Sequence, residues 1–339
     1  MQHPNTPPLN WNGRLVRFAD LIPCTNAFID ARSPGSDRKE NFTIIGPGVA
    51  ENPHQHVHIR EPHGFNVGGA RQPPHCTNSL HSHDTAEVFM IHTGTWRFFW
   101  GEHGDAGEVV VRPGDTISIP VHVFRGFENI GDDIGFMFSL LGGDDPGRVH
   151  WAPQVIETAR GHGLVLLENG TLIDITEGET VPPGAQPVAP STREQLAYIR
   201  TPSAGEMRRR IVLANATATA AHGGLQRDGV NEIPVIGAAS ADGIEAGPIN
   251  DPHGFTLRRL DLRAGASVRM HRRTCAEVLI VQRGALTVED AAGARITLNR
   301  GDTLTIPRHT GRALKNEGTD PVSVLVARAG EDPGAPEWS

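Results

Sequence analysis

A pattern of two histidines, a glutamate and a glycine occurs near residue 80, and a partial copy follows about 190 positions later. The first copy, His-x-His-x3-Glu-x6-Gly, runs from His81 to Gly94. The second runs from His271 to Gly284 and has Arg273 in place of the second histidine. Pro-His-Gly-Phe precedes both copies and Pro-x-His-x2-Arg-x3-Asn follows both, at 62–65, 252–255, 120–129 and 307–316. Matches in one order indicate a tandem duplication, so each copy is a control for the other.

A chain of 339 residues can form two domains, each with its own core. We expect an N-terminal arm at 1–60, a first domain at 61–175, a linker with short helices at 176–235 and a second domain at 236–339. The formal net charge of -8 argues against general affinity for nucleic acid or anionic membranes. No apolar run approaches the roughly 20 residues of a membrane span, no apolar signal core is evident, and 3 cysteines suit a reducing compartment. These features predict a cytoplasmic protein.

Short apolar segments separated by Gly and Pro turns fill both repeats and predict an all-β sandwich or barrel. Expected strands include 14–18, 42–45, 96–100, 108–111, 116–119, 135–141, 257–262, 277–282, 303–306 and 322–327. Between the repeats, Pro153 predicts the start of a helix that ends at Gly161. Ser203 and Glu206 predict a capping box for another helix, and 191–200 could form a further one.

The first histidine motif has the composition of a metal site. His81, His83 and Glu87 share parity, so on a regular strand pair their side chains can point the same way. Two imidazoles and a carboxylate bind first-row divalent ions and leave positions open for substrate or dioxygen, as in non-haem Fe(II) oxygenases. The alternative is an unliganded, partly exposed histidine pair. The accompanying glutamate and glycine and the duplication favour a metal.

The segment from His81 to Gly94, followed by the Gly-x5-Pro element at 114–120, resembles the cupin superfamily, and its duplication resembles a bicupin. The resemblance implies an all-β-dominated fold of two tandem double-stranded β-helix barrels, also called cupin jelly rolls, with a few linking helices. Cupins of this pattern bind iron, manganese, nickel, copper or zinc. They include dioxygenases, decarboxylases, isomerases, lyases and non-catalytic binding modules, so the fold does not settle the function.

The second part of the motif departs from the family pattern. Where that pattern has a glycine and a ligand histidine, this chain has His122 and Arg125, and the second copy has His309 and Arg312. His122 could replace the missing ligand, or Arg125 could line the cavity and hold a substrate carboxylate through a bidentate fork. The alternatives are a turn histidine bonded to backbone and a salt bridge of Arg125 on the barrel rim, for example with Glu128.

Several large side chains are candidates for the pocket wall. Alignment with Leu286 and Val288 predicts that Trp96 and Phe98 face the barrel interior, and parity adds three further residues: Trp100, Phe89 and Ile91. These side chains could form an aromatic-walled cavity over the metal, or they could simply fill a small barrel.

The second copy lacks one of the two histidines. Arg273 and Glu277 could form an internal ion pair where the metal would sit, which predicts a metal-free, structural second barrel.

We therefore expect one divalent transition metal per chain, Fe(II) before Mn, Ni, Cu or Zn, held by His81, His83 and Glu87. His122 is a candidate fourth ligand or general acid/base, and Arg125 a candidate catalytic anchor for an anionic small-molecule substrate. The expected activity is that of a dioxygenase, an oxidoreductase acting on a small organic acid or phenolic compound. An oxygen-independent isomerase, lyase or decarboxylase and a sugar- or metabolite-binding module are the alternatives. Open sheet edges and the N-terminal arm predict a homodimer or higher homo-oligomer.

Overall fold

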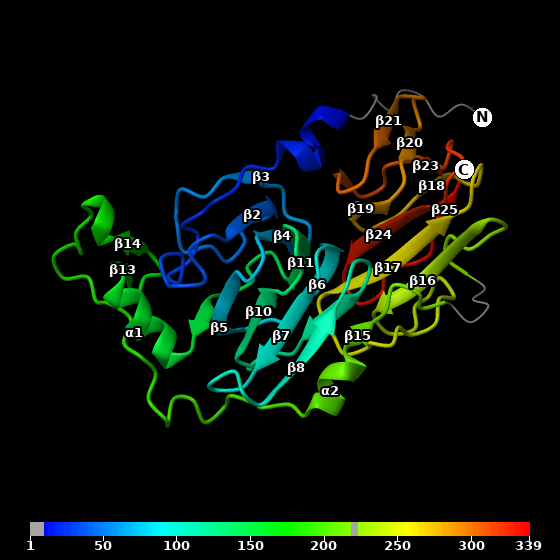
Figure 1. Ribbon diagram of the computed structural model, residues 1–339. Helices are drawn as coiled ribbons and strands as arrows, with labels where there is room; N and C mark the ends of the chain where they lie inside the picture. Colours follow the sequence, from blue (N-terminus) through cyan, green and yellow to red (C-terminus); the bar gives the residue numbers. More distant parts are fainter. Residues whose placement is uncertain (1–9, 218–222) are drawn as a thin grey trace. The chain divides into compact units, whose positions relative to one another are not determined.

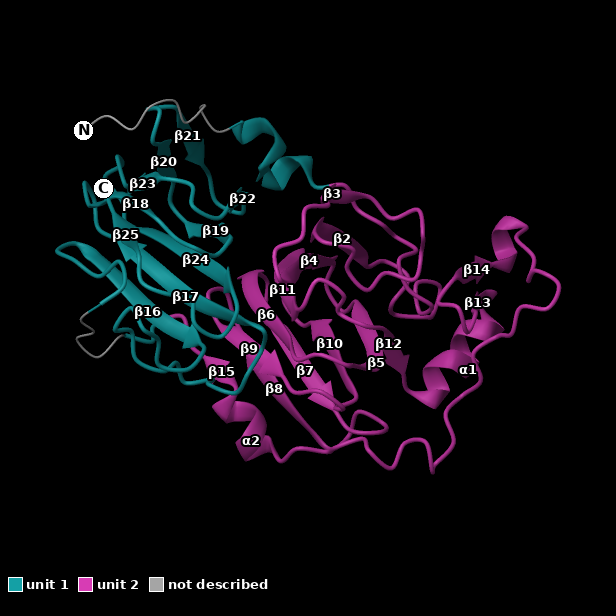
Figure 2. Ribbon diagram, turned by 180° about the vertical axis from the view of Figure 1, so that it is seen from behind, with its two compact units in different colours: residues 1–21, 215–339 teal, residues 22–214 magenta. Residues whose placement is uncertain are grey.

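β-strands dominate the computed structural model, which describes residues 10–217 and 223–339 (Figure 1). Within these ranges only two α-helices occur, so the prediction of an all-β-dominated fold is confirmed. The chain divides into two compact units, Ile22–Ala214 and Met1–Leu21 with Asn215–Ser339 (Figure 2). The residues expected to form an arm, 1–60, and those expected to form a linker, 176–235, are each divided between the two units.

The unit Ile22–Ala214 contains a barrel of two packed sheets. Its seven-stranded sheet has the order β15-β9-β6-β11-β4-β2-β3. The bounds are β15 Ile211–Val212, β9 Thr116–Ile119, β6 Glu87–Thr93, β11 Gly135–Gly142, β4 Phe65–Gln72, β2 Glu40–Ile45 and β3 Val57–Ile59. Its five-stranded sheet has the order β12-β5-β10-β7-β8. The bounds are β12 Val149–Trp151, β5 Thr77–His83, β10 Arg125–Asn129, β7 Trp96–Trp100 and β8 Gly107–Val111.

Period-two burial fixes how these sheets pack. Along β7, Trp96, Phe98 and Trp100 are buried while the residues between them are half-buried. The buried residues join Phe89 of β6 and Phe127 of β10 in one core cluster between the two sheets. The backbone explains why the motif has a glycine at position 94. Gly94 has φ +84, and a Cβ there would lie 2.7 Å from the Cα of Gly135.

The second unit repeats this architecture. Its six-stranded sheet has the order β1-β22-β19-β24-β17-β16. The bounds are β1 Leu15–Val16, β22 Thr303–Ile306, β19 Glu277–Arg283, β24 Val322–Ala329, β17 Phe255–Leu262 and β16 Val230–Ile236. Its five-stranded sheet has the order β21-β20-β23-β18-β25. The bounds are β21 Arg295–Leu298, β20 Leu286–Asp290, β23 Arg312–Lys315, β18 Ser267–Arg272 and β25 Glu337–Trp338.

A short strand from outside each repeat covers the same sheet edge in both barrels. Leu15 and Val16 of β1 pair with β22, and Ile211 and Val212 of β15 pair with β9. The strand expected near 14–18 therefore exists, but it belongs to the C-terminal barrel, where Arg17 is also 2.7 Å from Asp302. The chain itself covers two edges that would otherwise be open to another molecule.

The segment between the repeats contains α1 (Pro153–Gly161), β13 (Leu164–Leu166), β14 (Leu172–Asp174) and α2 (Ala204–Arg209). The predicted helix at Pro153 and the Ser203–Glu206 capping box are confirmed. The helix proposed for 191–200 is wrong: those residues form turns. Neither described helix is long and apolar enough to cross a membrane.

Candidate metal centre

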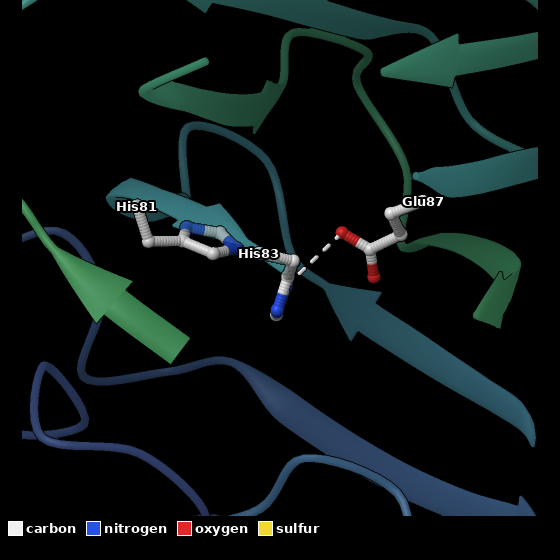
Figure 3. Close-up of side chains that lie close together, drawn as sticks. All are labelled: His81, His83 and Glu87. Carbon is white, nitrogen blue, oxygen red and sulfur yellow. Dashed lines mark ion pairs between the residues drawn. The ribbon is translucent and has the colours of Figure 1, made fainter. Parts of the chain in front are cut away.

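Three side chains that could hold a metal ion come together from the two sheets of the first barrel. His81 and His83 end β5 in the five-stranded sheet, and Glu87 begins β6 in the seven-stranded sheet. Their ligand atoms lie within 4.8 Å of one another and all three side chains are buried (Figure 3). It is the one group of this kind in the described part of the chain. The residues converge because a short turn joins two sheets, rather than through parity along a regular strand pair.

Burial makes both histidines neutral ligands, and a hydrogen bond also orients His81. His81 Nδ1 donates to the carbonyl of Ser79 at 2.7 Å, which leaves the Nε2 lone pair available. His83 Nε2 lies 3.4 Å from Glu87 Oε2, and its buried Nδ1 has no protein partner. Burial, and then the charge of Arg125, lower the pKa of both imidazoles, that of His81 well below its ordinary value. Both rings are therefore uncharged at neutral pH.

Glu87 is the anionic member of the group. Burial alone would raise its pKa, but the charge of Arg125 lowers the pKa below its ordinary value. Arg125 Nη2 donates to Glu87 Oε2, and Arg125 Nη1 donates to the carbonyl of His81 at 2.7 Å. Two neutral nitrogen donors and one ionised carboxylate fit a first-row divalent ion.

The pairing with Glu87 corrects the interpretation of Arg125. The guanidinium is buried against Glu87 and does not line the cavity, where a substrate anchor would have to be. Nor does it form the rim bridge, since Glu128 instead pairs with Arg97 at 2.5 Å. In the second barrel Arg312 pairs with Glu277 at 2.8 Å, so the arginine holds the glutamate in both repeats.

His122 lies outside the ligand group. Its φ is +61, as is that of His309, which explains why the family pattern has glycine at this position. Its ring packs 4.9 Å from the ring of Tyr198, and its carbonyl accepts from the Arg200 amide at 2.7 Å. The structure therefore does not bring His122 to the other three ligands.

A cavity of about 70 Å³ adjoins the three ligands. Of the predicted wall residues only Phe89 lines it, whereas Ile91, Trp96, Phe98 and Trp100 are buried in the barrel core. Much of the wall comes instead from residues that the sequence did not single out: Phe28, Phe42, Val49, Phe127, Leu141 and Trp151. No lysine or arginine of the described residues lines this cavity.

Buried charges fill the corresponding interior of the second barrel. The expected Arg273–Glu277 pair does not form. Arg273 donates to the carbonyl of Gly334 at 2.6 Å and to Asp242 at 3.2 Å. Glu277 instead pairs with Arg312 at 2.8 Å and with Arg328 at 2.6 Å.

Strand register shows which substitutions distinguish the two interiors. Leu141 is the register partner of Glu87, as Arg328 is of Glu277. Similarly, Asn41 of β2 pairs with Ala70, and Glu232 of β16 pairs with Leu260 at the equivalent position. Arg328 and Glu232 lie 2.7 Å apart. Where the second barrel has this ion pair, the first has a leucine and an asparagine that line its cavity.

The sequence contains a further repeat that the predictions above do not include. Gly-Gly-Asp-Asp-Pro-Gly before Trp151 matches Ala-Gly-Glu-Asp-Pro-Gly before Trp338. Strands β12 and β25 place the two tryptophans opposite His81 and His271, with ring centroids 5.2 and 5.4 Å apart. The repeated Asp-Pro-Gly could have revealed Trp151 as a wall residue of the site.

Comparisons with known proteins agree with this fold. Residues 258–328 match the family model described as Cupin domain. Oxalate decarboxylase from Lactobacillus farciminis, crystallised as a formate complex, is similar with a TM-score of 0.56 and 12% identity, covering 100% of this chain and 90% of that chain. Vicilin from Capsicum annuum is similar with a TM-score of 0.58 and 15% identity, covering 96% of this chain and 88% of that chain. A search of curated proteins finds no match.

The chain therefore has the fold of a two-domain cupin, a bicupin, and the predicted resemblance is confirmed. At these identities the likeness to solved structures shows the fold alone.

Proposed function

We propose that the first barrel is the active site of a metal-dependent oxidoreductase, a dioxygenase that acts on a small organic acid or phenolic compound. The observation that carries the proposal is the buried group of His81, His83 and Glu87 beside a cavity. One divalent transition metal per chain, Fe(II) first, would be held by these residues. When bound, the ion would supply Lewis-acid chemistry and a template for substrate and dioxygen.

The surrounding residues prepare the ligands before any ion binds. The Ser79 carbonyl fixes the tautomer of His81, and Arg125 fixes the carboxylate of Glu87. Such supporting contacts are typically worth about 10- to 100-fold in metal affinity. Arg125 is thus a positioning residue in this proposal.

The charge balance supports an anionic substrate. Arg125 offsets the charge of Glu87, so the positive charge of a divalent ion would remain uncompensated by these protein groups. Because the part of the chain that the structure describes places no lysine or arginine in the cavity lining, the ion itself would be the group that attracts an anion. Phe89, Phe127 and Leu141 supply apolar parts of a lining that also contains uncharged polar side chains such as Asn41 and Asn78.

Oxygen consumption tests the proposal. Protein purified without a metal-binding tag is stripped, loaded with Fe(II) without oxygen, and mixed with small organic acids and phenols in an oxygen electrode. We expect substrate-dependent oxygen uptake that His83→Ala abolishes and His271→Ala retains. Product formation without oxygen uptake would instead establish the oxygen-independent lyase, decarboxylase or isomerase alternative.

We also propose that the chain forms a homodimer or higher homo-oligomer. The edges at β9 and β22 are covered by β15 and β1 of the same chain, so assembly would use other surfaces. Strand β16, which ends the six-stranded sheet, is one such edge. Light scattering at micromolar concentration tests this, and a monomer there would contradict it.

A further inference from the structure

A second and larger cavity, of about 340 Å³, lies in the same unit as the metal cavity. Its walls come largely from the segment between the two repeats. Ile156 of α1, Leu166 of β13, Val188 and Leu196 contribute apolar side chains, and Phe124 adds an aromatic ring. Its volume falls within the range of about 300–1,000 Å³ that is usual for small-molecule pockets.

The two cavities adjoin each other, and part of their lining is common to both. Gly48, Val49, Ala50, Val149 and Trp151 line both of them. In β12, Val149 pairs with His83 and Trp151 pairs with His81, so this wall is directly attached to the strand that carries the metal ligands. Trp151 is held by its indole N–H, which donates to Glu51 Oε1 at 2.6 Å.

The charges around the larger cavity suit a neutral or anionic ligand. Arg148 is its one lining arginine, and Arg148 Nη1 donates to the carbonyl of Glu168 at 2.7 Å. His150 pairs with Asp84 at 2.8 Å. Burial raises the pKa of Glu51 to about 8, so that carboxyl adds little negative charge at neutral pH. Most of the other lining residues are apolar, with Ser191 and Tyr198 adding hydroxyl groups.

The two cavities differ in size and would suit different parts of one ligand. The metal cavity of about 70 Å³ accepts a small oxygenated head group, whereas the larger cavity accepts a bicyclic aromatic or medium alkyl body. We infer that the substrate is an amphipathic acid or phenol whose apolar body occupies the larger cavity while its head reaches the metal cavity past Val49 and Trp151. The position of the head rests on the proposed function, while binding of the body does not require the metal.

Calorimetry with naphthalene carboxylate as the probe tests this inference. We expect the probe to bind the metal-free protein. Leu196→Trp and Ser191→Trp, which place bulk in the larger cavity from a segment of turns, should each weaken binding at least about tenfold. Leu213→Trp is the matched control because Leu213 is 53% exposed and lines neither cavity. Circular dichroism of each variant verifies folding.

A second measurement connects the body to the head. Loading the wild-type protein with Mn(II) should tighten probe binding about tenfold or more, because the carboxylate then contacts the ion. Absence of probe binding, unchanged affinity in both cavity variants, or no tightening in metal-loaded protein would each overturn the inference. If elemental analysis shows that the wild-type chain takes up no metal, the proposed function fails. The metal-free binding of the three variants then decides alone whether the larger cavity is a binding site.

Discussion

Leu141→Arg should give the first barrel a charged interior like that of the second barrel. Leu141 lines the metal cavity opposite Glu87, and Arg328 at the equivalent position pairs with Glu277 at 2.6 Å. An arginine there would reach Glu87, which Arg125 already engages. We expect the variant to lose metal binding, because a second guanidinium competes for the carboxylate and repels the ion.

The size of the expected loss in metal affinity follows from the repulsion between the new guanidinium and the ion. Two unit charges about 4 Å apart interact by about 4 kcal/mol at an effective dielectric constant of 20, and repulsion of a divalent ion is at least as large. This corresponds to a loss of about three orders of magnitude in metal affinity. Stability should also fall by about 3–5 kcal/mol, because the new buried cation has no carboxylate of its own.

A double variant separates these two effects. Arg328 has a second partner in Glu232 at 2.7 Å, whose counterpart in the first barrel is Asn41. Adding Asn41→Glu to Leu141→Arg should restore most of the lost unfolding free energy without restoring metal binding. Urea unfolding and calorimetry with Mn(II) measure the two quantities, and Leu141→Met is the volume-conserving control. If Leu141→Arg binds metal within tenfold of wild type, the argument from register is refuted.

Three other experiments test the metal content, the buried ion pairs and the pH dependence of stability. Elemental analysis should find about one metal per wild-type chain, none in His81→Ala and about one in His271→Ala; two equivalents would contradict the asymmetry of the repeats. Arg125→Gln should lower the unfolding free energy by about 3–5 kcal/mol, because it leaves Glu87 without its arginine. Arg312→Gln should cost less, because Glu277 keeps Arg328, and equal losses in urea unfolding would reject this explanation. The pKa of Glu51 is raised to about 8 by burial, so the folded state retains a proton that the unfolded state releases. Stability should therefore decrease as pH rises towards 8, by up to about 1.4 kcal/mol per unit. Glu51→Gln should flatten that slope in urea unfolding, and an unchanged slope would show that Glu51 does not cause it.

The sequence by itself determined the features that depend on short-range pattern. Period-two alternation and turn residues located β7, β9, β11 and their counterparts, and the repeated motif indicated two barrels. The group of His81, His83 and Glu87 followed from one contiguous motif, because a short turn joins the strands that carry it. The helix starting at Pro153 and the capping box at Ser203 were also local signals.

The tertiary structure decided the partners of these residues. Parity can show that Trp96 faces inward, but whether it lines a cavity or packs in the core depends on the opposite sheet. Arg125 reaches Glu87, and β1 covers the edge of the distant repeat; neither contact has a local signature. The open interior of one barrel and the charged interior of the other arise from Asn41, Leu141, Glu232 and Arg328, which lie on strands far from the motif in sequence. Side chains from such distant strands meet only after the sheets pack, so their packing and charge balance are properties of the folded barrel.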